Sequence, residues 1–121
     1  MSLSIEIRRQ DDSVVLELSG RLSIFEQNLR QVVRNLMERG DRHFIMDLAN
    51  VSYVDNAGLG QLCLVYTMLQ ERRGEMKLLK PTARIRKLLN ITKLDTVFEL
   101  LEEENDELPG RPDFFTSAAS A

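Results

Sequence analysis

Apolar residues recur along the chain with two different spacings, and these spacings predict where its strands and helices lie. Two short runs, 3–7 and 14–18, show the alternation of apolar and polar residues that is typical of strands. The polar stretch between them, 10–13, is too short for a crossover connection. The two runs are therefore predicted to pair as an antiparallel hairpin.

Apolar residues at spacings of three and four predict helices further along the chain. Residues 25–37 and about 57–73 each carry one apolar face, and Gly40 and Gly74 supply the expected C-terminal stops. Pro81 suits the first turn of a third helix. An acidic cluster that follows, 102–107, predicts a short fourth one.

Three apolar runs between these helices predict the remaining strands, at 43–49, 76–79 and 97–101. Strands that alternate with helices after one hairpin imply right-handed crossovers and parallel pairing. The predicted fold class is therefore α/β, with a mixed, mostly parallel sheet of about five strands and about four helices. The strand order is expected to be sequential, with only the first strand antiparallel.

Length and charge limit the possible functions. A chain of 121 residues suits one domain, which we place at 1–108, followed by a C-terminal tail at 109–121 that is expected to be flexible. Sixteen basic and nineteen acidic residues leave a net charge of −3, which argues against direct nucleic-acid binding and favours protein partners. No apolar run approaches the ~20 residues that span a bilayer, so we expect a cytoplasmic protein without membrane insertion.

Side chains that support catalysis are scarce. The chain has one histidine, His43, and one cysteine, Cys63, which cannot build a zinc cluster or an intramolecular disulfide. Asp47 and Asp55 flank one strand and loop segment, and no other chemical group is predicted to converge on them. A glycine-rich phosphate loop with its lysine is also absent from the sequence. We therefore expect no enzyme activity, no metal and no cofactor.

The segment 44–60 carries the most information, because it reads as a buried strand, an acidic turn and a helix start. The helix is predicted to begin at Asp55 or Asn56, whose short side chains accept the first free backbone N–H groups. Gly58 and Gly60 are expected to allow close backbone approach. A helix start of this kind is also a natural seat for an anion.

This segment resembles the signature of the STAS family, the bacterial anti-sigma factor antagonists. The hexamer 55–60 reads Asp-Asn-Ala-Gly-Leu-Gly, where the family has Asp-Ser-Ser-Gly-Leu-Gly or a close variant. The turn at 19–22, the strand-like run 74–78 and Lys80-Pro81 are also similar to family features. The resemblance covers roughly residues 3–108 and implies the STAS fold.

The resemblance also implies a switch position and a binding surface. In the family the second hydroxyl residue of the hexamer is phosphorylated, and the matching residue here is Ala57, which has no hydroxyl. A second departure is Ser23, where the family commonly has Asp. The residues implied at the partner-binding surface are Arg21, Ser23, Asp55, Asn56, Ala57, Gly58, Leu59 and Thr82.

The function implied by this resemblance is a regulatory protein-binding module in a partner-switching pathway. Its expected partner is an anti-sigma factor or a histidine-kinase-like serine kinase, and it is not expected to be phosphorylated at the usual site. Two alternatives stay open: an accessory STAS subunit of a membrane ABC transport complex for lipid, and a scaffold of a signalling assembly. A homodimer is also open.

Overall fold

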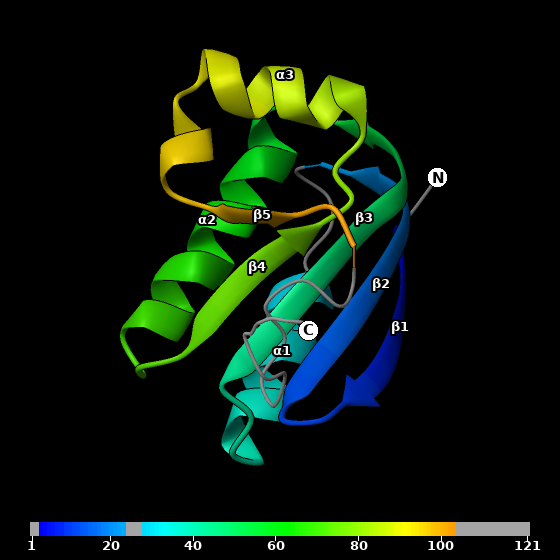
Figure 1. The fold of residues 1–121 in the computed structure, drawn as a ribbon. Coiled ribbons are helices and arrows are strands. Elements are labelled where there is room, and N and C mark those ends of the chain that lie inside the picture. Colours follow the sequence, from blue (N-terminus) through cyan, green and yellow to red (C-terminus); the bar gives the residue numbers. More distant parts are fainter. Residues whose placement is uncertain (1–2, 24–27, 104–121) are drawn as a thin grey trace, which may run out of the picture.

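Five strands form one sheet in the order β1-β2-β3-β4-β5, with helices on one face and at one end (Figure 1). The computed structural model describes residues 3–23 and 28–103. In chain order the elements are β1 (Leu3–Gln10), β2 (Ser13–Leu22), α1 (Asn28–Glu38), β3 (His43–Val54), α2 (Asn56–Gln70), β4 (Glu75–Leu79), α3 (Ala83–Ile91), the 3-10 helix η1 (Leu94–Thr96) and β5 (Glu99–Leu101).

The strand pairing confirms the predicted topology. Strand β1 pairs antiparallel with β2, and every later neighbouring pair is parallel. The described residues contain three α-helices and η1, rather than about four helices. The fourth helix, expected at 102–107, falls mainly on residues 104–121, which lie outside the described part of the chain. The flexible tail expected at 109–121 lies there as well.

Strand β3 is longer than the predicted run at 43–49, because it continues to Val54. Relative to β2, it gains one residue at each of two irregularities, between Glu17 and Ser19 and between Gly20 and Arg21 of β2. The polar and exposed Asn50 interrupts the apolar run at this point. The prediction stopped at that interruption, and the bulged continuation carries the chain on to the start of α2.

Several other boundaries differ from the predictions by a few residues. Helix α3 begins at Ala83, after a cap at Thr82, so Pro81 precedes the helix and does not lie in its first turn. Strand β5 begins at Glu99 rather than at residue 97. The predicted start of the first helix at residue 25 lies outside the described residues.

Helices α1 and α2 pack on the same face of the sheet, behind it in the view of Figure 1. Their apolar faces and the inward side chains of β2, β3 and β4 form the main core. Buried members of this core are Val14, Leu16, Leu18, Leu29, Val33, Leu36, Phe44, Met46, Leu48, Leu62, Val65, Leu69, Met76 and Leu78.

Cross-strand ion pairs lie on the face of the sheet that α1 and α2 do not cover. Arg8 contacts Glu17 at 3.0 Å, His43 contacts Glu75 at 2.9 Å and Lys77 contacts Glu99 at 3.5 Å. A small apolar cluster lies on the same strands and consists of Val15, Ile45, Leu79 and Leu101. Within residues 3–23 and 28–103, no helix is both long and apolar enough to cross a membrane.

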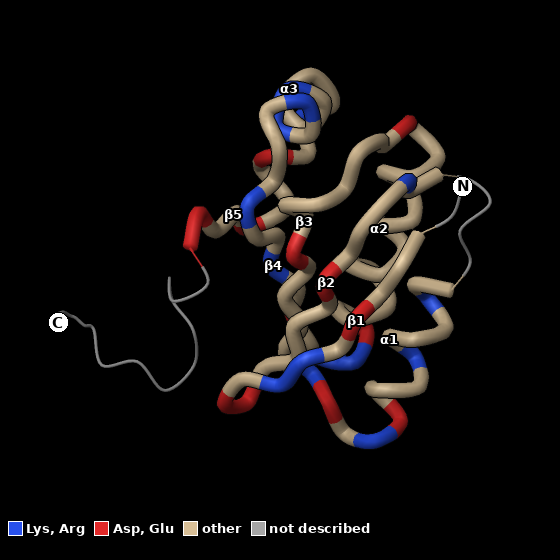
Figure 2. The backbone as a smooth tube through the Cα atoms, turned by 90° about the vertical axis from the view of Figure 1, so that its right-hand side faces the viewer, with Lys and Arg blue, Asp and Glu red and all other residues tan. Residues whose placement is uncertain are grey.

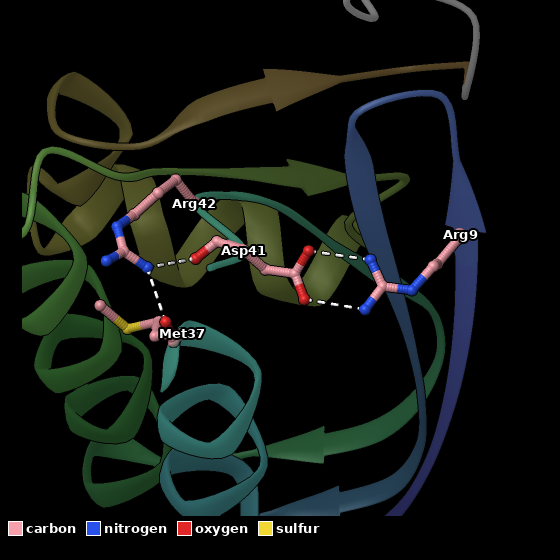
Figure 3. A network of polar contacts seen from close by, with 4 residues as sticks. All are labelled: Arg9, Met37, Asp41 and Arg42. Atoms are coloured by element: carbon pink, nitrogen blue, oxygen red, sulfur yellow. Dashed lines mark hydrogen bonds and ion pairs between the residues drawn. The ribbon is translucent and has the colours of Figure 1, made fainter. Parts of the chain in front are cut away.

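A polar network joins β1 to the turn between α1 and β3 (Figure 3). Arg9 donates two hydrogen bonds of 2.8 Å to the carboxylate of Asp41, and Arg42 donates to the carbonyl of Met37 at 2.8 Å. The hydrogen bonds from Arg9 lower the pKa of Asp41 below its ordinary value. Gly40 ends α1 with a φ of 103°, as its predicted role as a stop requires.

Asp41→Asn is expected to destabilise the domain at neutral pH and to have less effect in acid. The lowered pKa of Asp41 means that its contribution is present above the unfolded pKa, about 4, and is lost as pH falls through the lower folded value. The effect should be modest because Arg9 is largely exposed. Melting curves across this pH range measure it, with exposed Asp12→Asn as the control. A difference from wild type that stays constant with pH would contradict the account.

Candidate functional site

The site lies where β3 ends and α2 begins, at the carboxyl end of the parallel strands. Asp55 has extended backbone angles and caps α2, because its side chain accepts a 2.7 Å hydrogen bond from the N–H of Gly58. Its carbonyl accepts a further bond of 2.9 Å from the N–H of Leu59. The helix therefore starts at Asn56, one of the two residues at which the sequence predicted it to begin.

Gly58 brings the start of α2 against the end of β2. A Cβ atom at this position would lie 1.9 Å from the carbonyl oxygen of Leu22 and 3.1 Å from the backbone nitrogen of Ser23. Only a residue without a Cβ fits at such a distance. The predicted close backbone approach is thus confirmed at Gly58, and it joins two segments that are far apart in the sequence.

Gly60 does not have the close approach that the sequence analysis expected. A Cβ atom there would have no heavy atom within 4 Å, so the prediction for this glycine is wrong. The difference arises because Gly60 lies two residues further around α2, on a side of the helix that does not face β2.

Ala57 lies between the exposed Asn56 and the buried Gly58, and its side chain is half-buried. It belongs to the first turn of α2, where backbone N–H groups have no partners within the helix. The Asp55 side chain satisfies that of Gly58, and the Asp55 carbonyl accepts the first hydrogen bond of the helix, from Leu59. The positive end of the helix dipole is therefore next to Ala57.

Two further predicted surface residues come from the end of β2. The guanidinium carbon of Arg21 lies 4.1 Å from the ring centre of Tyr53, its neighbour in β3. This is the geometry of a cation–π contact, and it holds the long Arg21 side chain across the two strands. Ser23 follows directly after β2 and is half-buried. Sequence reasoning did not select Tyr53 and missed this stacking.

Thr82 caps a different helix at the same end of the sheet. Its hydroxyl accepts a 3.3 Å hydrogen bond from the N–H of Ile85 at the start of α3. Figure 1 shows the starts of α2 and α3 both near the upper end of the sheet. The structure therefore brings Asp55, Gly58 and the end of β2 into contact, whereas Thr82 belongs to a neighbouring helix start.

Gln61 is a polar residue of α2 that sequence reasoning did not select. It is 8% exposed, and its Oε1 atom has no hydrogen-bond partner in the part of the chain that the structure describes. It lies four residues after Ala57, and therefore on the same side of the helix. The only signal in the sequence was an amide within the otherwise apolar stretch 57–65.

Side chains that sequence reasoning considered for catalysis are used structurally. Burial raises the pKa of the Cys63 thiol, which disfavours the nucleophilic thiolate. His43 contacts Glu75 at the start of β3 and β4. Asp47 accepts a 3.1 Å hydrogen bond from the N–H of Ala49. Among residues 3–23 and 28–103, no cluster of three or more His, Cys, Asp or Glu is arranged to hold a metal ion.

Known proteins are similar to this chain in sequence and in fold. The anti-sigma-B factor antagonist of Staphylococcus aureus strain NCTC 8325 is 30% identical over 103 residues, which are 84% of this chain and 95% of that protein. An anti-sigma factor antagonist from Mycobacterium paratuberculosis has a TM-score of 0.75 at 20% identity, over 87% of this chain and 90% of that one.

A Bacillus cell fate determinant solved in its phosphorylated form has a TM-score of 0.65 at 21% identity, over 84% of this chain and 94% of that one. At this level of identity, the two structural matches show the fold. The model of the STAS domain matches residues 4–107. With most of its 121 residues matched in this way, the chain belongs to the STAS domain family.

Proposed function

We propose that this protein binds an anti-sigma factor, or a histidine-kinase-like serine kinase that acts as one, through the start of α2. The surface comprises the exposed first turn around Asn56 and Ala57, the capping carboxylate of Asp55, and the adjacent end of β2 with Arg21 and Ser23. Thr82 extends this surface towards α3. Gly58 and Leu59 are buried, so we assign them the role of positioning the helix start rather than of touching the partner.

One observation carries this proposal. Ala57 lies in an intact, capped helix start, at the position that matches the phosphorylated residue of the STAS signature. The relatives named above support the class of partner, because those with function names are called anti-sigma factor antagonists. The cap by Asp55 and the close approach of Gly58 to Leu22 fix this helix start without a hydroxyl residue at position 57.

Ala57 makes the proposed binding constitutive. A phosphate group brings roughly −1.5 to −2 charges and three strong acceptors, which an interface shaped for a small neutral side chain does not accommodate. A methyl group cannot receive a phosphate. We therefore infer that this chain stays in its binding state when relatives with a hydroxyl at this position would be released.

We expect the chain to resist phosphorylation around the start of α2. Ala57 and Asn56 carry no hydroxyl, and the hydroxyl of nearby Ser52 is engaged in a 3.1 Å hydrogen bond to the carbonyl of Gly20. The chain is incubated with ATP and a serine kinase that phosphorylates STAS-family relatives. Measurement of its intact mass should then show no added phosphate. A stoichiometric phosphate mapped to residues 52–60 would contradict the proposal.

Ala57→Ser is expected to create a phosphoacceptor, because the new hydroxyl lies in the first turn of α2 where a kinase of the family would act. Equal treatment of wild type and variant provides the control. If the variant binds the kinase and remains unmodified, Ser23→Asp combined with Ala57→Ser tests the second departure from the family pattern. A double variant that binds the kinase and is still unmodified would show that the kinase does not use this site.

A further inference from the structure

Strand β1 forms one edge of the sheet and, among the described residues, pairs only with β2. It is eight residues long and pairs with β2 in one continuous register. The opposite edge, β5, has only three residues. Figure 2 shows β1 at the front of the molecule, with α1 beside it. A long, regular edge strand presents a row of backbone N–H and C=O groups to a further strand.

The hairpin fixes which backbone groups of β1 point outwards. Only two residues separate Gln10 from Ser13, so this pair closes the hairpin and exchanges both backbone hydrogen bonds. Along an antiparallel ladder such pairs alternate with non-hydrogen-bonded ones. Every second residue counted back from Gln10 therefore turns its backbone groups towards β2. The backbone groups of Ile5, Ile7 and Arg9 point to the open edge.

We propose that β1 pairs antiparallel with β1 of a second copy of this chain, around a two-fold axis at Ile7. Two Ile7 residues then exchange both backbone hydrogen bonds, and the two five-stranded sheets join into one. This interaction is independent of the proposed function, because it uses the edge of the sheet rather than the start of α2.

Charge complementarity supports this register. Glu6 and Arg8 lie on the same face of β1, and a two-fold axis at Ile7 places each Glu6 opposite Arg8 of the second copy. These are non-hydrogen-bonded pairs, in which side chains approach most closely. Arg8 already contacts Glu17 and Gln10, and its guanidinium has five N–H donors to share. An axis at Arg9 would instead place two guanidinium groups opposite each other.

The side chain at the axis is apolar and exposed. Ile7 is 51% exposed, on the face of the sheet that carries the helices. Self-pairing removes its side chain from water against that of the second copy. One pair of edge strands buries less surface than a stable dimer interface. The association is therefore expected to be weak, with dimer forming at high protein concentration.

Sedimentation velocity of the full chain between about 10 μM and about 1 mM tests the proposal. We expect a dimer whose fraction rises with concentration. Ile7→Lys places two like charges at the axis and should weaken self-association by at least about tenfold. Leu64→Lys on α2 is the matched control, because Leu64 is an apolar residue with 50% exposure away from β1, and it should leave the dimer unchanged.

A pair of charge reversals tests the register itself. Glu6→Arg and Arg8→Glu should each self-associate less than wild type, because each places like charges opposite one another. An equimolar mixture of the two should restore the dimer, since both cross-strand pairs are then complementary. Melting curves confirm that each variant is folded. If Arg8→Glu does not fold, the two single variants Glu6→Arg and Ile7→Lys still test the proposal. A wild type that is monomeric throughout, or equal effects of Ile7→Lys and Leu64→Lys, would overturn the proposal.

Discussion

Gly58→Ala is expected to lower the stability of the domain by about 3 kcal/mol or more, because the new Cβ would lie 1.9 Å from the carbonyl oxygen of Leu22. The conflicting atom is backbone and not the end of a flexible side chain, so α2 or the end of β2 must move. For a domain of this size, such a loss corresponds to a melting temperature about 12 °C lower or more. Calorimetry or thermal circular dichroism measures the shift.

Gly60→Ala is the matched control for this effect. It makes the same chemical change in the same helix, where the new Cβ would have no heavy atom within 4 Å. Replacing a helical glycine by alanine stabilises by about 0.5 to 1 kcal/mol when the space is free. The two substitutions should therefore have opposite signs. Similar melting temperatures for both would show that the approach between β2 and α2 is not as close as the structure has it.

Ala57→Glu is expected to leave the fold intact and to weaken partner binding strongly. A carboxylate in the first turn of α2 interacts favourably with the helix dipole, by about 0.3 to 1 kcal/mol. Against a bound partner, however, the same charge is buried without a counter-charge, which costs about 2 to 5 kcal/mol. The loss of affinity should thus dominate, while the melting temperature stays equal or rises slightly.

Two further variants separate charge from size and from general surface effects. Ala57→Gln has nearly the same shape as Ala57→Glu without the charge, so it should lose less affinity. Thr67→Glu adds the charge about 15 Å further along α2 and should bind like wild type. If calorimetric titration shows unchanged affinity for Ala57→Glu, the partner surface lies elsewhere. The basic stretch of α3 with exposed Arg84 and Lys87 is then the next candidate.

Much of the fold could be predicted from sequence because its elements have local signals. The short polar connection at 10–13 limited the first two strands to a hairpin, and the helical spacing before Gly40 marked α1. The second half of β3 could not be predicted in this way. Its course depends on pairing with β2 across two irregularities, and Asn50 gives a polar interruption where the strand in fact continues.

The candidate site was predictable to a similar degree. Asp55 was expected as the cap of α2 because a short acidic side chain before an apolar helix has one common role, and the structure confirms it. The different environments of Gly58 and Gly60 could not be predicted, because they depend on where the end of β2 lies. The stacking of Arg21 on Tyr53 likewise requires the register of β2 and β3.

In the proposed function, this chain holds an anti-sigma partner at the start of α2 and is not released by phosphorylation. The most direct test is calorimetric titration of this chain with a candidate kinase-like anti-sigma factor that is encoded near the gene of this chain. The titration is done before and after the chain is incubated with the same anti-sigma factor and ATP. The account predicts one binding affinity in both titrations for wild type, and an affinity that ATP treatment weakens for Ala57→Ser. Loss of wild-type binding after ATP treatment would contradict it.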